Sequence, residues 1–560
     1  MNFNYIGDLK SNSIINEHKI DINKIDKKIN LFETFIIIRN KDDFKVYDRT
    51  CDHAGGKIIT KNNQFICPLH SWNFDPIKGT YSNGVRKREI KNNIKDGLLI
   101  FQIKEQIPKI NKVNLDENVK IRFINHAFVI ISGKNFKFAM DPWAIGPAFN
   151  SGWWLKFETK KDWIEDLNTC NFIFTSHNHP DHLNKQTLSH VRKDMQFVVP
   201  KYKTDSTGIF IETLGFEKIF RCDFKKMYKY DQSNLIFSIL KSGDFRDDSG
   251  IYFSIGNFSC LFDVDTNNVN FNNLPKVDLY ASSFAGGASG YPLIFTNYTE
   301  EEKIRIIKKN RLSLKLFKEK NLIKINPKYF LPYAGFFQES LDRDNYIYKN
   351  NIKNKITDYD KICNKISAKL LNVEQFDEFH FFGNRLLNEK KLNIKYFKDE
   401  NQTVYLNKIK KEYSSIDENY IINYFKNSNF RDNLLLRVEL TDEKFEKILY
   451  NFDVDFSKKN TEIFLNLKKI NFNYKKNNNK KYLNIKCRIE SFLNTLYNKE
   501  PWEDLTIGFQ CLIYRYPNIY NVDFWYHFSN IYVTKKNVRS ITNCNNCDKI
   551  NQIIDSQLNQ

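Results

Sequence analysis

The sequence predicts a multidomain protein with an N-terminal all-β unit, a central α/β unit and a C-terminal α+β region. Its 560 residues exceed what one hydrophobic core usually supports, and the hydrophobic share of 41% is enough for several cores. The apolar pattern also changes twice along the chain. We therefore place the domains at residues 1–110, 111–348 and 349–560.

Each predicted unit has its own pattern. In the first, short strand-like runs such as FETFIIIR and GLLIFQI are separated by Asn, Asp and Gly turns, which is typical of an all-β fold. The second alternates apolar strands such as NFIFTS and MQFVVP with charge-rich helical segments, which indicates α/β structure. The third has long amphipathic runs such as RIESFLNTLYNK, interrupted by the solvated tract NYKKNNNKKY.

Composition excludes several classes of function. The net charge is +20, but the lysines are scattered among Asn and Ile in every part of the chain, so we expect no nucleic-acid groove. No apolar run approaches the roughly 18 residues that a membrane span needs, and MNFNYIGDLK lacks a signal-peptide pattern. We expect a cytoplasmic protein without a membrane span, whose ten cysteines leave thiolates for metals.

Two cysteine–histidine pairs lie in the first unit. Cys51-x-His53 is followed by Cys67-x-x-His70, and such pairs on facing loops suit either a Cys2His2 zinc ion or a Rieske [2Fe–2S] cluster. Two glycines follow the first pair and a proline stiffens the second loop, whereas zinc fingers place their histidines on a helix. The segments CxHAGG and CPxHxW resemble the Rieske signature, in its lower-potential, oxygenase-associated form.

A second candidate metal site follows the apolar strand NFIF. The loop SHNHPDHLN gathers three imidazoles and a carboxylate, a costly arrangement unless a cation holds them, although a solvated polar loop is the alternative. The spacing HxHxDH resembles the metallo-β-lactamase signature. That resemblance makes the candidate metal ligands His177, His179, Asp181 and His182.

The same resemblance implies a bridging aspartate at a later strand end. Asp265 is the candidate, with Asp263 on the same strand face as its rival. Beyond His190 no histidine follows until His380, and Asp244 stands where the fold's third histidine is expected. Two metals are then hard to hold, while two histidines and a carboxylate are the set used by non-haem Fe(II) oxygenases.

The two motifs together resemble the cytidine monophosphate-N-acetylneuraminic acid hydroxylase family. Four further blocks support this in the expected order: DPWAIGPAFNSGWWL from Asp141, SSFAGGASGYP from Ser282, LPYAGFFQES from Leu331 and IGFQCLIYRYPNIYNVDFWYHF from Ile507. The resemblance implies a Rieske domain fused to a metallo-β-lactamase-like αββα domain. It further implies a monooxygenase that converts the N-acetyl group of CMP-N-acetylneuraminate to N-glycolyl.

The resemblance also implies cofactors and partners. The catalytic residues are the four loop ligands with Asp265, and the cofactors are the [2Fe–2S] cluster, a mononuclear Fe(II) and O2, with zinc or a dinuclear site as alternatives. The partners are a nucleotide-sugar substrate and an electron donor protein, cytochrome b5-like or a ferredoxin with its reductase. Asp244 and Leu341 stand where the family is expected to have histidines, which leaves the exact substrate open.

Other interpretations stay open. A zinc metallo-hydrolase that carries the Rieske cluster as a redox sensor is the main alternative, and a binding module with a vestigial site is the third. His126 is either near the metal or a satisfied core histidine, and Trp153 and Trp154 either wall a pocket or pack. The C-terminal region has no chemistry that its sequence names.

Overall fold

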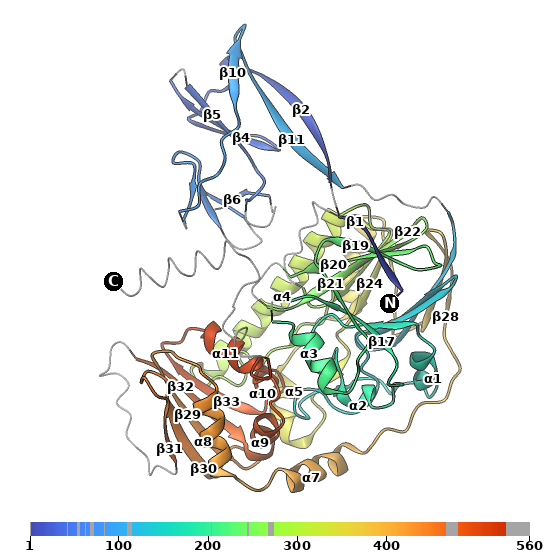
Figure 1. The fold of residues 1–560 in the computed structure, drawn as a ribbon, viewed down its shortest axis with the longest axis vertical. Helices are drawn as coiled ribbons and strands as arrows, with labels where there is room; N and C mark the ends of the chain where they lie inside the picture. Colours follow the sequence, from blue (N-terminus) through green and yellow to red (C-terminus); the bar gives the residue numbers. More distant parts are fainter. Residues whose placement is uncertain are drawn as a thin grey trace. The chain divides into compact units, whose positions relative to one another are not determined.

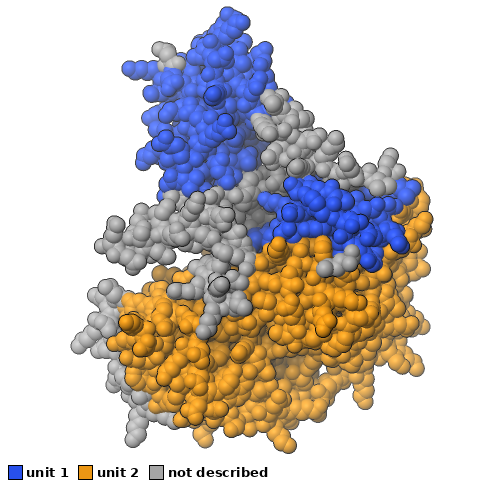
Figure 2. Space-filling view, viewed as in Figure 1, with its two compact units in different colours: residues 1–115, 223–278, 542–560 blue, residues 116–222, 279–541 orange. Residues whose placement is uncertain are grey.

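Two units make up the computed structural model (Figures 1 and 2). It describes residues 2–9, 11–41, 43–52, 57–61, 63–67, 72–82, 84–108, 115–202, 204–242, 246–266, 274–465 and 480–533. In this part of the chain the first unit comprises residues 1–115 and 223–278, and the second comprises residues 116–222 and 279–541. The boundaries predicted from sequence stay a prediction, since these units do not follow chain order.

The first unit is built of antiparallel strands. Three small sheets lie before residue 115, in the orders β3–β4–β5, β10–β11–β2 and β6–β7–β8–β9. Their strands are β2 (Ser11–Asp21), β3 (Ile29–Leu31), β4 (Phe35–Asn40), β5 (Asp43–Asp48), β6 (Ile59–Lys61), β7 (Gln64–Ile66), β8 (Asn73–Asp75), β9 (Thr80–Tyr81), β10 (Asn92–Lys95) and β11 (Leu98–Pro108), with the 3-10 turn η1 (Ile22–Lys24). The predicted all-β character of this region is confirmed.

Strand β4 explains why this region holds two cores. Its run FIII is buried, and successive side chains point to opposite faces of a strand. Ile36 and Ile38 pack with Cys51, Cys67 and Trp72. The intervening residues of the same strand pack toward β11, so the cysteines sit in a dry apolar cluster of their own.

The first unit also contains an antiparallel run in the order β1–β19–β20–β21–β22. These strands span β1 (Phe3–Asp8), β19 (Lys226–Tyr230), β20 (Leu235–Lys241), β21 (Ser249–Ile255) and β22 (Phe258–Phe262). Strands β21 and β22 are buried along their whole length, which matches their almost continuously apolar sequences.

The second unit begins with a mixed sheet in the order β18–β17–β16–β14–β13–β12–β27–β28. Strands β14, β16, β17 and β18 are parallel and the rest antiparallel. Its strands are β12 (Asn118–Asn125), β13 (Phe128–Gly133), β14 (Phe136–Met140), β16 (Phe172–Phe174), β17 (Gln196–Pro200), β18 (Ile219–Cys222), β27 (Glu378–Phe382) and β28 (Arg385–Lys390).

Short helices cover the parallel part of this sheet. Helices α1 (Trp163–Asn168) and α3 (Ser206–Thr213) supply Trp163, Leu167 and Ile211 to a core that also contains the strand residues Ile173 and Phe197. The remaining elements before residue 400 are β15 (Trp154–Leu155), β23 (Leu279–Ser283), β24 (Tyr329–Tyr333), β25 (Phe337–Gln338), β26 (Lys369–Leu370), α1 (Trp163–Asn168), α2 (Lys185–Leu188), α3 (Ser206–Thr213), α4 (Glu300–Ile325), η3 (Asp342–Asp344), α5 (Asn345–Asn350), η4 (Ile356–Tyr359) and α6 (Asp360–Lys365).

The C-terminal region is a five-stranded sheet with helices, in the order β31–β30–β29–β32–β33 (Figure 1). Its elements are α7 (Gln402–Glu412), α8 (Glu418–Asn427), β29 (Leu434–Thr441), β30 (Ile448–Asp455), β31 (Glu462–Leu465), β32 (Lys481–Arg488), α9 (Ile489–Tyr497), α10 (Glu503–Ile507), β33 (Cys511–Tyr516) and α11 (Val522–Ser529). The predicted multidomain class, with an α+β C-terminal region, is confirmed. No helix in the described ranges combines the length and apolar character that crossing a bilayer requires.

One apolar core joins the C-terminal sheet to the central sheet. Trp143, Phe149 and Trp153 pack in the same cluster as Trp502 and Phe528. A close backbone approach fixes this contact, since a Cβ on Gly152 would lie 2.0 Å from the carbonyl oxygen of Gly508. Neither glycine position therefore has room for a side chain.

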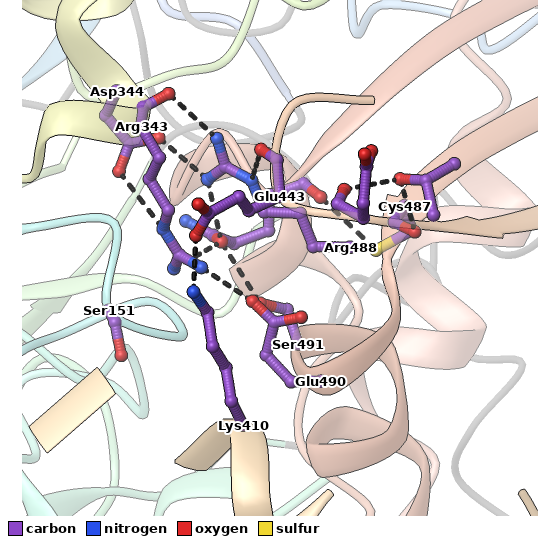
Figure 3. Close-up of polar contacts among 12 residues, drawn as sticks. Ser151, Arg343, Asp344, Lys410, Glu443, Cys487, Arg488, Glu490 and Ser491 are labelled. Atoms are coloured by element: carbon purple, nitrogen blue, oxygen red, sulfur yellow. Dashed lines mark hydrogen bonds and ion pairs between the residues drawn. The ribbon is translucent and has the colours of Figure 1, made fainter. Parts of the chain in front are cut away.

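A buried network of charges makes the second connection (Figure 3). Arg488, at the end of β32, donates from Nη1 to Asp344 Oδ1 at 2.7 Å, and Arg343 donates from Nη1 to Glu490 Oε1 at 2.6 Å. Gln510 Oε1 accepts from Arg343, Arg488 and Ser491. Burial lowers the pKa of Arg343, with the Arg488 charge adding to the effect. Two cations and two carboxylates thus neutralise each other in the buried interior.

Arg488→Met should therefore destabilise the protein strongly. The substitution keeps the aliphatic stem but leaves the Asp344 carboxylate buried without its main partner, which costs about 3–5 kcal/mol. Chemical denaturation that follows tryptophan fluorescence measures this loss. Arg305→Ala, on the exposed face of α4, is the control and should change stability by less than about 0.5 kcal/mol. Equal effects of the two variants would contradict the assignment.

Candidate metal centre

The histidine-rich loop begins where strand β16 ends. All three residues of β16 are buried, and the strand runs parallel to β14 on one side and β17 on the other. Thr175 extends this ladder by donating its N–H to the carbonyl of Val198. Ligands of open α/β sheets bind at the carboxyl ends of parallel strands. The local fold thus places His177 at the carboxyl-end edge of the parallel strands, where a ligand site is expected.

His177 and His179 face each other across this edge. His177 Nε2 lies 2.9 Å from His179 Nδ1, and the two ring centroids are 4.5 Å apart. His182 is the third ring, with its centroid 4.3 Å from that of His177. His177 and His182 are buried and His179 is half-buried. The loop therefore brings three imidazoles together, which suits a cation at their common centre.

Asp141 orients two members of this group. It follows β14, is fully buried, and accepts hydrogen bonds from Ser176 N at 2.7 Å and from Ser176 Oγ at 2.8 Å. Oδ1 takes the Ser176 N–H bond, while Oδ2, which accepts from Ser176 Oγ, also lies 3.1 Å from His182 Nδ1. A carboxylate at Nδ1 holds the proton on that nitrogen, so Nε2 of His182 is the atom presented to a metal.

A second buried group forms around Asp181. His126 Nε2 lies 3.1 Å and His182 Nε2 lies 3.4 Å from Asp181 Oδ2, and the ligand atoms of the three residues lie within 4.8 Å of one another. Burial by itself raises the pKa of the Asp181 carboxyl, but the His182 and His126 rings hold it well below its usual range. Among the described residues, Asp181 Oδ1 has no hydrogen-bond partner. An ionised, unsatisfied carboxylate oxygen beside imidazoles fits a metal ligand.

The C-terminal region supplies carboxylates that the sequence did not point to. Glu503, the first residue of α10, places Oε2 3.5 Å from His179 Nε2. This contact favours Nδ1 of His179 as the metal-facing atom, since Nε2 is turned toward the carboxylate. The neighbouring Asp504 is buried, and burial, together with the Glu500 charge, raises the pKa of its carboxyl well above the usual value. Asp141 did carry a signal, because it follows a strand at the start of a motif block.

The iron–sulfur ligands are described in part. Cys51 and Cys67 are buried among Trp72 and Tyr81, and the N–H of Cys67 donates to the carbonyl of Trp72, which closes the second loop. Lys87, buried at Nζ, contacts the Asp48 and Asp52 carboxylates and the carbonyl of Thr50. Lys87 thus links Asp48, Thr50 and Asp52, the residues that flank Cys51 in the described part of the chain. The predicted ligands His53 and His70 lie outside the described residues, as does Asp244.

Asp265 and Asp263 belong to the first unit, just after β22. The carbonyl of Asp265 accepts from Arg246 Nη2 at 3.2 Å, and the carbonyl of Asp263 accepts from Thr266. The role of Asp265 as a metal ligand stays a prediction. Leu341, which stands where the family was expected to have a histidine, packs against Trp154 and Leu406.

The two tryptophans of the motif block are packing residues. Trp153 stacks on Phe337 with ring centroids 3.5 Å apart and donates its indole N–H to the carbonyl of Ile507. Trp154 is also buried, and its indole N–H donates to the carbonyl of Ser151. They support the segment beside the histidine loop.

Comparisons with known proteins agree with these motifs. A family model for the Rieske [2Fe-2S] domain matches residues 11–93. The chain carries a Rieske domain. The predicted [2Fe–2S] cofactor is confirmed by this match.

Curated relatives span almost the whole chain. The cytidine monophosphate-N-acetylneuraminic acid hydroxylase of Macaca mulatta is 27% identical over 94% of this chain and 95% of its own length. The hydroxylase of Xenopus laevis is 29% identical over 89% of this chain and 88% of its own length. The predicted resemblance to these hydroxylases is confirmed. Among solved structures, CmlA, a diiron beta-hydroxylase from Streptomyces venezuelae, is 16% identical, with a TM-score of 0.33 over 49% of this chain and 55% of that chain.

The donor set fits the iron predicted for the loop. The loop offers three neighbouring imidazoles, His177, His179 and His182, and the Asp181 carboxylate beside His182. This pool includes the two histidines and one carboxylate that Fe(II) oxygenases use. The same ligands also bind zinc, and metal analysis of the purified protein distinguishes iron from zinc. His177, His179, Asp181 and His182 are the residues that would hold the ion.

Asp141→Asn should weaken metal binding about 10- to 100-fold, because the amide cannot hold the His182 proton on Nδ1 as a carboxylate does. Titration of the metal-free protein with Fe(II) under anaerobic conditions measures the affinity. Asp360→Asn, at the exposed start of α6, is the matched control and should bind as the wild type does. Wild-type affinity in the Asp141 variant would refute the orienting role.

Cys67→Ser should remove the cluster, because a hydroxyl is a poor substitute for a thiolate ligand of iron. Absorbance and the spin-resonance signal of the reduced protein measure the cluster. Cys170→Ser is the control: its thiol donates to the carbonyl of Asp166, and burial raises the pKa of Cys170 to about 12. A full signal from the Cys67 variant would exclude it as a ligand.

Proposed function

We propose that the protein is a Rieske-type iron monooxygenase that hydroxylates the N-acetyl group of a nucleotide-activated sugar. Conversion of CMP-N-acetylneuraminate to CMP-N-glycolylneuraminate is the specific reaction proposed. The observation that carries the proposal is the presence, in one chain, of a Rieske domain and a buried group of imidazoles with a carboxylate. The named hydroxylases that match almost the whole chain support the substrate class.

The cofactors and the protein side chains have different roles in the proposed reaction. The cluster supplies single electrons, and iron bound in the loop supplies oxygen activation. The protein contributes orientation, since Asp141 sets the proton of His182 and Glu503 lies against the outer nitrogen of His179. The protein also shields the site from solvent. The ring centroids of Trp143 and His126 are 5.1 Å apart, and these two rings pack beside Asp181. Dry surroundings strengthen each of these electrostatic contacts.

Reduction requires a separate protein. We include in the proposal an electron donor of the cytochrome b5 or ferredoxin type with its reductase. Asp265 is included as an additional ligand from the sequence resemblance, and its test is the metal stoichiometry of Asp265→Asn.

Metal and sulfide analysis of the anaerobically purified protein tests the reaction class. About three irons per two acid-labile sulfides, with a Rieske-type signal, are expected for a cluster plus one mononuclear iron. About two irons with one or two zincs would instead identify a hydrolase with a redox attachment. That result would end the monooxygenase proposal.

Turnover under labelled O2 tests the reaction itself. The reduced protein should convert CMP-N-acetylneuraminate to a product that carries one labelled oxygen atom, and Cys67→Ser should form none because no electrons reach the site. The Cys170→Ser variant is the control and should turn over normally. An unlabelled product would contradict direct oxygenation, and the absence of product would reject this substrate in favour of other N-acylated nucleotide sugars.

A further inference from the structure

A pocket opens beside the histidine loop, entirely within the second unit. It contains about 750 Å³ of space between atoms, part of which is open solvent. Asn178 and Pro180, on either side of His179, form one wall, and Phe149 continues it with its ring centroid 5.7 Å from that of His179. A ligand in this pocket lies next to the metal-binding loop.

The opposite wall comes from the C-terminal region. Glu490, Ser491 and Asn494 of α9 and Asp504 of α10 line it, and the charge network around Arg343 holds this wall in place (Figure 3). The pocket therefore exists only because the C-terminal region packs on the central sheet. This gives residues beyond 349 a role that their sequence did not reveal.

The charges in the pocket already compensate one another. Lys185 forms an ion pair with Glu500, and Arg343 is paired with Glu490. Asp504 also lines the pocket, and it adds no positive charge to these two neutralised pairs. A phosphate would meet a lining without spare positive charge, whereas neutral hydroxyl groups would find acceptors there.

The uncharged lining suits a polyhydroxylated ligand. Asparagine, glutamine and serine residues line the pocket together with Phe149, Phe210 and Tyr405. Asp504 is the decisive residue, because its Oδ1 is buried and, among the described residues, has no hydrogen-bond partner. Such an orphaned acceptor is costly unless a bound group donates to it.

We propose that this pocket binds the hydroxyl-bearing part of the sugar, with Asp504 accepting a hydrogen bond from a sugar hydroxyl. The assignment rests on the proposed function and deepens it, since it separates the sugar site from the nucleotide phosphate. Asp504 acts in binding and takes no part in the oxidation. Because the pocket adjoins His179, a sugar held there presents its acyl group to the metal loop.

Binding of separate substrate parts tests the pocket. Saturation-transfer NMR titrations of the metal- and cluster-loaded protein with free N-acetylneuraminate and with cytidine monophosphate are compared across variants. Asp504→Leu, which keeps the side-chain shape but has no acceptor, should weaken N-acetylneuraminate binding about tenfold or more and leave nucleotide binding unchanged. Asn494→Phe, which fills the pocket from α9, should do the same, and exposed Glu446→Gln should bind like the wild type.

The outcomes separate the pocket from the reaction. Wild-type sugar affinity in both pocket variants, an equal loss of nucleotide binding, or no sugar binding by the wild type would each overturn the assignment. Turnover of CMP-N-acetylneuraminate by the wild type tests the proposed function alone. If turnover is absent while sugar binding depends on Asp504, the proposed function fails and the pocket assignment stands.

Discussion

The buried ion pair between Arg488 and Asp344 ties the C-terminal sheet to the rest of the second unit. Buried charges must be paired and hydrogen-bonded, and Gln510 Oε1 accepts one hydrogen bond from each arginine. The need to pair these charges restricts how β32 can pack against η3. The register of β32 in turn sets where α9 and α10 lie, and with them Glu503 and the wall of the pocket.

Orientation of the metal-binding loop depends on a different carboxylate. Asp141 is supplied by β14 and Ser176 by the end of β16, and these strands are adjacent and parallel. The contact therefore comes directly from sheet pairing. Glu503 approaches from the other side, so the ring nitrogens of the loop are constrained both by the central sheet and by the C-terminal region. The central sheet and the C-terminal region therefore both position the ligands, although the ligands themselves come from one short segment.

The Rieske part shows how a small unit keeps two cysteines dry. Strand β4 divides its apolar side chains between two cores, and one of these encloses Cys51 and Cys67. The buried side chain of Lys87 pairs with the adjacent, partly exposed Asp48 and Asp52 carboxylates.

By itself, the sequence determined the chemistry of the protein. Cysteine and histidine spacing identified the Rieske domain, the strand-then-HxHxDH pattern placed the ligand loop, and alternating apolar runs indicated the fold class, because ligands within one loop are local in sequence. Only the tertiary structure decided the partners of those ligands. Asp141, Glu503 and Asp504 reach the loop through sheet pairing and the packing of a distant domain. Contacts between distant segments depend on packing and buried charge, which leave no periodic pattern in a single sequence.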